Sequence, residues 1–184
     1  MSGGSLLKKG LPYDAEIEYL ESSGTQGIDT LLSYFADFEI GIKLRENKKN
    51  YALGVDTNKS LSRISEELPC WQFSSINSYM TNIPIAEYHV LKWADDKIFC
   101  DGVYLSDFTK ERESTVQHMI LFGIPGAYRA NIIYYCKLYS PTTHSIVRDF
   151  IPVRVGTTGY MYDKVSGQLF GNAGTGSFIL GADV

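Results

Sequence analysis

The feature that most constrains the fold of this chain is its closing segment, residues 148–184, in which short apolar runs alternate with glycine-rich reversals. Gly supplies the positive φ angles that tight reversals need, so runs of this kind are typical of short antiparallel strands. A last strand without a partner would leave unpaired backbone groups, so we expect it to pair near the first strand of the chain. The runs are Phe150–Val155, Tyr160–Tyr162, Gln168–Phe170 and Phe178–Leu180, with reversals at Ser166-Gly167 and at residues 172–176.

The same pattern continues through the rest of the chain. Phe38, Ile40, Ile42 and Leu44 alternate with polar residues and predict a half-buried strand. Asp101-Gly102 lies between two apolar runs, which favours a type I′ hairpin. Residues 56–68 predict either a loop or a short helical turn. The expected strands are Ala15–Ser22, Thr25–Leu31, Phe35–Leu44, Tyr51–Val55, Cys70–Ser75, Ser78–Ile83, Glu87–Trp93, Thr115–Ile124 (central, covered on both sides) and Asn131–Tyr139.

In the last of these, simple alternation places Ile133, Tyr135, Lys137 and Tyr139 on one face and Ile132, Tyr134, Cys136 and Leu138 on the other. About a dozen short strands with regular turns predict an all-β fold, a two-sheet antiparallel sandwich. The length of 184 residues suits one domain, expected over residues 13–184, after a flexible arm of residues 1–12. The 13 Tyr and 9 Phe agree with a fold rich in strands.

Charge and composition exclude several classes of protein. The net charge of −4 and the lack of a basic block argue against nucleic-acid binding. No apolar run approaches the length of a membrane helix, and the first ten residues lack the apolar core of a signal peptide. We therefore expect synthesis in the cytoplasm. Cys70, Cys100 and Cys136 have no metal-site or redox spacing, so buried free thiols are expected.

Both ends of the chain resemble the concanavalin A-like, or laminin-G-like, jelly-roll modules of gut bacteria and their phages. The resemblance rests on Tyr13–Gln26 and Ile28–Thr30 at the start. At the end it rests on Arg148–Pro152, Gly159–Asp163, Val165–Gly167 and Asn172–Gly176. It covers residues 13–184 but is weak between about 45 and 95. Gly27 departs from the pattern, since such modules usually carry an aromatic residue there.

The resemblance implies a jelly-roll sandwich and a non-enzymatic structural or adhesive module of a phage virion, such as a fibre, decoration or receptor-binding component. It implies a homo-oligomer, such as a trimer, and contacts to other virion or surface proteins through residues 1–12. Host glycans are the expected ligand. The alternative is a carbohydrate-binding lectin located on a bacterial cell surface. Fold analogy alone does not establish function.

A third hypothesis is a glycoside hydrolase. Glu16, Glu18 and Glu21 resemble the carboxylate array of jelly-roll glucanases, and strand alternation puts Glu16 and Glu18 on one face. The array lies on the first strand, has Glu at its middle position and needs a bulge to include Glu21. A solvated strand face is the favoured interpretation, so no catalytic residue is assigned.

Sugar binding needs aromatic rings beside planar polar groups. The sequence offers Trp71 with Gln72, Tyr79 with Asn77 and Asn82, and Tyr128 with Arg129, although such aromatics more often pack in a core. No metal site is predicted: His89, His118 and His144 have no zinc spacing, and no loop has a dedicated calcium pattern. Carboxylates that could supply calcium oxygens are Asp37, Asp56, Asp95, Asp96 and Asp101. No cofactor is expected.

Overall fold

The structure is a computed structural model that describes residues 10–44, 50–63, 70–74, 78–84, 87–109 and 115–184. These residues form strands and turns without a helix, so the all-β prediction is confirmed. In this described part there is accordingly no helix able to cross a membrane. Of the proposed arm of residues 1–12, residues 1–9 lie outside the described residues.

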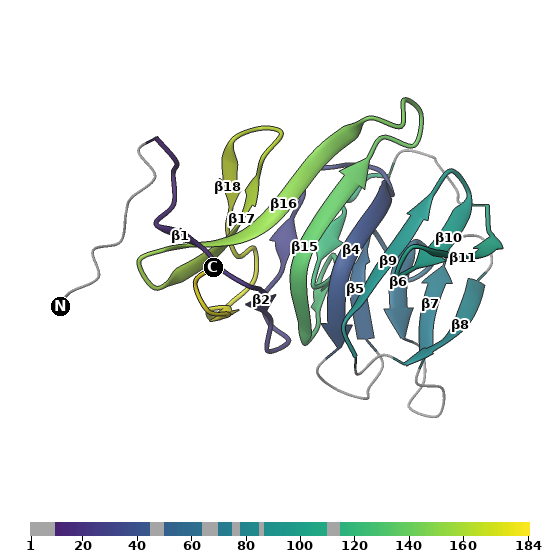
Figure 1. Cartoon of the computed structure of the whole chain (residues 1–184), viewed down its shortest axis with the longest axis horizontal. Coiled ribbons are helices and arrows are strands. Elements are labelled where there is room, and N and C mark those ends of the chain that lie inside the picture. The colour runs from purple at the N-terminus through teal and green to yellow at the C-terminus, as the bar shows by residue number, and fades with distance from the viewer. Residues whose placement is uncertain (1–9, 45–49, 64–69, 75–77, 85–86, 110–114) are drawn as a thin grey trace.

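An eleven-stranded antiparallel sheet dominates the fold (Figure 1). Its main order is β11-β10-β9-β4-β15-β16-β17-β18, and β1, β2 and β19 pair along its flank. The bounds of the main strands are β4 Asp37–Leu44, β9 His89–Ala94, β10 Lys97–Cys100, β11 Val103–Asp107, β15 Asn131–Tyr139, β16 Ile146–Val155, β17 Thr158–Asp163 and β18 Gln168–Phe170. The flanking strands are β1 Ala15–Glu16, β2 Leu20–Glu21 and β19 Ile179–Leu180.

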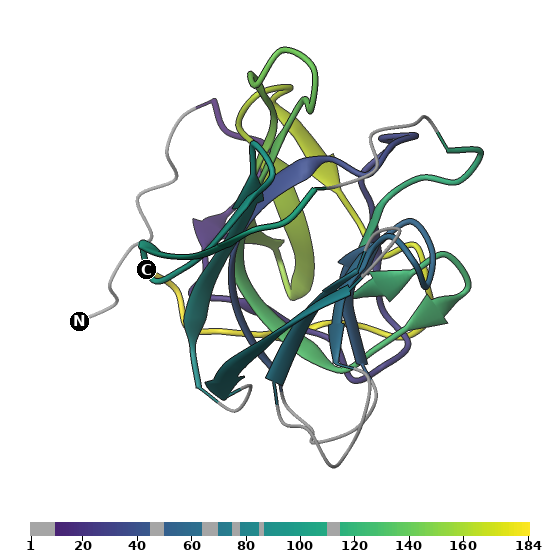
Figure 2. The same cartoon turned by 90° about the vertical axis from the view of Figure 1, so that its right-hand side faces the viewer.

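A six-stranded sheet with the order β3-β12-β5-β6-β7-β8 covers one face of the large sheet. Its strands are β3 Ile28–Asp29, β12 Ile120–Leu121, β5 Asn50–Gly54, β6 Ser60–Arg63, β7 Cys70–Ser74 and β8 Ser78–Pro84. A small hairpin of β13 Gly123–Ile124 and β14 Ala127–Tyr128 forms a two-stranded sheet of its own, which packs beside β5. Figure 2 shows the strands of the two large sheets on opposite sides of the core, a sandwich-like arrangement.

The core between the sheets is aromatic. Trp93 of β9 and Phe38 of β4 are fully buried and meet Phe73 of β7, with ring centroids 5.7 and 6.1 Å from that of Phe73. The Trp93 indole N–H donates to the Phe108 carbonyl at 2.8 Å, so its polar atom is satisfied. Burial of such rings supplies the main stabilisation of the sandwich.

Several expected strands are shorter than predicted. The strand expected over Ala15–Ser22 bends at Glu18 and is divided into β1 and β2, and Thr25–Leu31 contains only β3. The run Thr115–Ile124 is interrupted at Phe122, whose φ of 65° is left-handed. Its expected burial is nevertheless confirmed, because Met119, Ile120, Leu121 and Phe122 are all buried. The undecided stretch 56–68 contains β6, which the sparse apolar pattern did not indicate.

The hairpin turn expected at Asp101-Gly102 is confirmed. Asp101 and Gly102 both have positive φ, 50° and 80°, as a type I′ turn requires. Asp95 and Asp96 likewise have positive φ, 52° and 58°, in the turn between β9 and β10. The closing prediction is also confirmed, since β19 pairs with β2 through Ile179–Glu21 and Leu180–Leu20.

The resemblance motifs at the two ends lie against each other. The Asn172 side chain accepts hydrogen bonds from the backbone N–H groups of Gly27 and Gly174. The backbone N–H of Thr175 donates to the Thr25 carbonyl, and Thr25 returns a side-chain bond to the Thr175 carbonyl. A Cβ at Gly174 would lie 2.0 Å from the Thr25 oxygen, so only glycine fits there. The two motifs therefore hold the two ends of the domain together, and this hydrogen-bonded contact between residues 25–27 and 172–175 is called the lock below.

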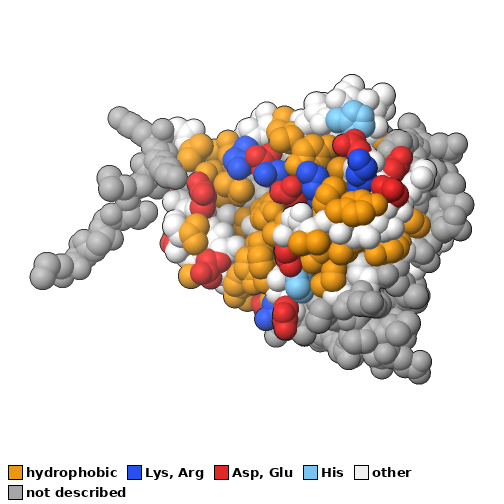
Figure 3. Space-filling model, turned by 45° about the vertical axis from the view of Figure 1, so that its right-hand side comes forward, with side chains coloured by type: hydrophobic (Ala, Val, Ile, Leu, Met, Phe, Trp, Pro, Cys, Tyr) orange, Lys and Arg blue, Asp and Glu red, His pale blue; other side chains and the backbone are white. Residues whose placement is uncertain are grey.

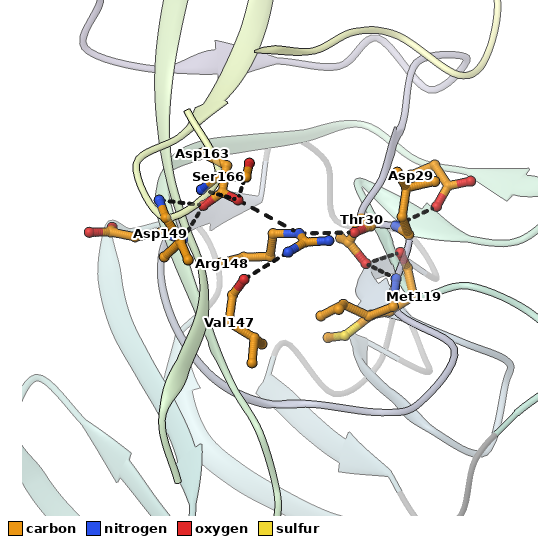
Figure 4. Close-up of polar contacts among 11 residues, drawn as sticks. Asp29, Thr30, Met119, Val147, Arg148, Asp149, Asp163 and Ser166 are labelled. Carbon is orange, nitrogen blue, oxygen red and sulfur yellow. Dashed lines mark hydrogen bonds and ion pairs between the residues drawn. The ribbon is translucent and has the colours of Figure 1, made fainter. Parts of the chain in front are cut away.

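A second group of motif residues forms a buried polar network (Figure 4). Asp163 is fully buried and accepts hydrogen bonds from the backbone of Asp149 and from the backbone and hydroxyl of Ser166. Arg148 lies 3.8 Å from the Asp163 carboxylate and donates to the Thr30 carbonyl. Because Thr30 follows β3, this arginine joins the large sheet to the small one. These residues therefore hold the fold together.

Candidate functional site

The residues that the sequence offered for sugar binding do not form one surface. Trp71 is fully buried in the core and Gln72 is buried with a hydrogen bond from Ser62 to its carbonyl oxygen. Tyr79 is partly buried between Phe73 and Phe108. Asn77 lies outside the described residues, as does the side chain of Asn82. In this conformation Trp71 and Gln72 present no face to a ligand.

Tyr128 and Arg129 lie at the small hairpin, where they make internal contacts. A Cβ at Gly27 would lie 2.3 Å from the Tyr128 ring, so this ring fills the space that a side chain at position 27 would need. The Tyr128 hydroxyl donates to the Ala173 carbonyl at 3.3 Å. Arg129 donates to the Tyr128 carbonyl and its guanidinium lies 5.8 Å from the Tyr51 ring centroid. Tyr128 therefore supports the lock between the two ends, and Arg129 packs behind it against Tyr51.

The proposed hydrolase carboxylates lie on a broken strand. Glu16 is in β1 and accepts a hydrogen bond from the Tyr13 hydroxyl at 3.0 Å. Glu18 is exposed at the bend and Glu21 is buried in β2. Because the strand is not continuous from Glu16 to Glu18, alternation no longer puts their side chains on one face.

The outer face of the large sheet, opposite the core, carries a row of alternating charges across five neighbouring positions. Lys92 of β9, Glu39 of β4, Lys137 of β15 and Asp149 of β16 are direct partners in the strand register, and Lys164 follows β17. The Glu39 carboxylate lies 3.7 Å from the Lys92 ammonium and 3.6 Å from that of Lys137. The Lys164 ammonium lies 3.1 Å from the Asp149 carboxylate. Figure 3 shows a band of alternating positive and negative side chains among hydrophobic ones.

Tyrosines lie beside this charge row because β15 contains a bulge. The register shifts between Ile133 and Tyr135, so Ile133 and Cys136 both face the core while Tyr134 and Tyr135 are both partly exposed on the outer face. The predicted grouping of Ile133 with Tyr135 is therefore wrong. The Tyr134 ring meets that of Tyr88 at 4.7 Å.

Gly41 of β4 makes room for this cluster. A Cβ at Gly41 would lie 2.7 Å from the Tyr135 ring and 3.0 Å from the Tyr88 hydroxyl. The Tyr135 hydroxyl donates to Glu39 at 3.2 Å, which links the tyrosines to the charge row.

Next to this row the surface is hollowed to about 330 Å³. The hollow is lined by residues of β4, β9 and the β10–β11 hairpin, namely Glu39, Val90, Lys92, Phe99 and Gly102. The Phe99 ring meets that of Tyr104 edge-on at 5.8 Å. An apolar ring beside a carboxylate and an ammonium is an arrangement that can stack on one face of a ligand and hydrogen-bond its edge.

The electrostatics keep the tyrosines of this face protonated. Burial and then the Glu39 charge raise the pKa of Tyr135, and the same two causes raise the pKa of Tyr139. Burial followed by the Asp101 charge raises the pKa of Tyr88. Their hydroxyls are therefore hydrogen-bond donors at neutral pH.

Of the carboxylates considered for calcium, Asp37 and Asp95 lie together beside His144, whereas Asp56 and Asp101 lie elsewhere. Asp56 accepts backbone hydrogen bonds from Asn58 and Lys59 within its own turn. Asp95 lies 2.5 Å from His144, and its backbone N–H donates to Asp37. Asp101 pairs with His89 at a different end of β9. Among these described carboxylates none belongs to an oxygen-rich loop of the kind that binds calcium.

The sequence did not single out Glu39, Lys92, Phe99 or Tyr135. Part of the site could have been found, because the polar face of Phe35–Leu44, which includes Glu39, follows from alternation. Which strands lie side by side could not be inferred.

Comparison of the chain with known protein families, with curated proteins and with solved structures finds no match in any of the three.

Proposed function

We propose that this chain is a non-enzymatic glycan-binding module of the concanavalin A-like jelly-roll type, and that the outer face of the large sheet is its binding surface. The observation that carries the proposal is the hollow beside the charge row, where Phe99 lies next to Glu39 and Lys92. Sugars present apolar C–H faces and a rim of hydroxyls. An aromatic ring with flanking charged hydrogen-bonding groups suits both.

Binding is favoured over hydrolysis by the number of carboxylates. Among the described residues that line the hollow, Glu39 is the one acid, and two lysines surround it. Glycoside hydrolysis ordinarily needs two carboxyl groups, about 5–5.5 Å apart for retention or about 6.5–9.5 Å for inversion. The test below also examines the alternative hypothesis of a hydrolase that uses Glu16 and Glu18.

The setting that we propose is a phage virion, in a fibre, decoration or receptor-binding component, with a bacterial surface lectin as the alternative. The resemblance of residues 13–30 and 148–176 to such modules supports this setting. In this setting residues 1–12 would attach the module to other virion proteins, and the chain would act as a closed oligomer such as a trimer.

The test is binding of the full chain to a panel of neutral and acidic soluble oligosaccharides, measured by calorimetry. Phe99→Ala should weaken binding by about tenfold or more, since loss of a central aromatic contact usually costs over 1 kcal/mol. Val103→Ala is the matched control, because Val103 is 63% exposed on the same hairpin and does not line the hollow. Absence of binding across the panel, or binding that Phe99→Ala leaves unchanged, would overturn the proposal.

The same oligosaccharides test the enzyme hypothesis. We expect no release of reducing sugar. Release by the wild type that is lost in Glu16→Gln or Glu18→Gln would instead favour the hydrolase, and loss in Glu39→Gln would make the hollow its active site.

A further inference from the structure

We propose that His89, Cys100 and Asp101 form a binding site for a Zn²⁺-type divalent cation at the end of the β9–β10 pair. The three potential ligand atoms are Nδ1 of His89, Sγ of Cys100 and Oδ2 of Asp101, and all lie within 4.8 Å of one another. The site is independent of the proposed glycan function.

The strand register brings these residues together. Cys100 is the direct partner of Leu91, so His89, two residues before Leu91, lies diagonal to Cys100 on the same face of the sheet. Asp101 follows at the turn, where its backbone N–H donates to the Val90 carbonyl at 2.8 Å. Two strands and a type I′ turn thus hold the three side chains, which is a rigid support for a metal site.

The distances suit a tetrahedral metal ion. His89 Nδ1 lies 2.8 Å from Asp101 Oδ2, and Cys100 Sγ lies 3.4 Å from that oxygen and 3.8 Å from Nδ1. Bonds of about 2.0–2.3 Å at tetrahedral angles separate the ligand atoms by about 3.3–3.6 Å. Shifts of roughly half an ångström would therefore place a zinc ion among the three atoms.

The surroundings orient the ligands. The other Asp101 oxygen, Oδ1, accepts from the Val90 N–H at 2.8 Å, which fixes the carboxylate with Oδ2 toward the histidine. Nδ1 of His89 faces Asp101 and Cys100 and is therefore the nitrogen that can reach the cation, whereas Nε2 is buried without a hydrogen-bond partner among the described residues. Half of the Asp101 side chain is exposed, which leaves a fourth position open to water.

The mixture of one thiol, one imidazole and one carboxylate selects the metal class. Thiolate and imidazole favour Zn²⁺ over the hard cations Ca²⁺ and Mg²⁺, which prefer oxygen ligands. In the metal-free protein Cys100 donates its S–H to Asp101. On binding, the thiol proton leaves to solvent and the imidazole proton moves from Nδ1 to Nε2, so one proton is released per cation.

Cobalt is the probe, because a thiolate–Co²⁺ bond gives a near-ultraviolet charge-transfer band and a tetrahedral site gives visible bands. The reduced, chelator-treated full chain should show both bands at one equivalent of Co²⁺, and Zn²⁺ should abolish them by displacement. Cys100→Ser should remove the charge-transfer band. Asp101→Asn should weaken affinity by tenfold or more while the hairpin still forms, because Asn-Gly also favours a type I′ turn.

Three controls share the chemistry but not the site. His118 forms a similar pair with Asp29, so His118→Gln should leave the bands unchanged. Cys70→Ser and Cys136→Ser should do the same, with folding checked by circular dichroism. The absence of bands at stoichiometric Co²⁺, or a charge-transfer band that survives Cys100→Ser, would overturn the proposal.

Discussion

Side chains of β4, β9 and β15 point alternately to the inner and the outer face of the large sheet, and the two faces differ in burial and in charge. On the inner face Phe38, Trp93 and Leu138 are fully buried. On the outer face, one residue away along each strand, Glu39, Lys92 and Lys137 form a partly exposed charge row. The inner face holds the sandwich together, and the outer face is the surface that we propose binds a ligand. We therefore expect substitutions to separate stability from binding according to face.

The largest expected effect is on the inner face. Trp93→Ala should lower the free energy of unfolding by about 3–5 kcal/mol, since it removes a buried ring that contacts both sheets and leaves a cavity. Chemical denaturation measures this change. The control is its neighbour, Lys92→Ala, for which a partly exposed ion pair predicts a change below about 1 kcal/mol. Similar losses for both variants would contradict the distinction between the faces.

A middle-sized effect is expected where the outer face is tightly packed. Gly41→Ala should destabilise by about 1–3 kcal/mol, because its Cβ would lie 2.7 Å from the Tyr135 ring. Removing that ring should relieve the clash. In a double-mutant cycle, Gly41→Ala combined with Tyr135→Ala should therefore lose less stability than the sum of the two single changes. Additive losses would show that the ring does not occupy this space.

The smallest effect is a pH dependence on the outer face. The pKa of Tyr135 is raised in the folded protein by burial and by Glu39. A raised pKa contributes stability that is complete below the unfolded value of about 10 and is lost as the pH rises above it. Tyr135→Phe should therefore show a shallower loss of stability above pH 10 than the wild type. At neutral pH the variant should lose about 0.5–1.5 kcal/mol for its hydrogen bond to Glu39.

Denaturation curves at several pH values between 8 and about 11 measure this slope. Equal slopes for the wild type and Tyr135→Phe would mean that Tyr135 ionises as freely in the folded as in the unfolded chain. The neutral-pH difference would then report the hydrogen bond alone.

Local sequence patterns are sufficient to predict the fold class, most strand positions and the closure of the chain. These follow from local causes: alternation in Phe35–Leu44, the type I′ turn at Asp101-Gly102, and the need of the last strand for a partner. The structure also explains Gly27, where the chain departs from the jelly-roll pattern, because the Tyr128 ring occupies the space that a side chain there would need.

The places where polar and aromatic side chains gather depend instead on how the strands are assembled. One bulged residue in β15 moves Ile133 into the core and leaves Tyr134 and Tyr135 side by side, which no count of alternation reveals. Likewise Lys92, Glu39 and Lys137 are far apart in the chain and meet because β4 lies between β9 and β15. Strand order and register depend on long-range pairing, and so the candidate sites appear only when the sheet is assembled.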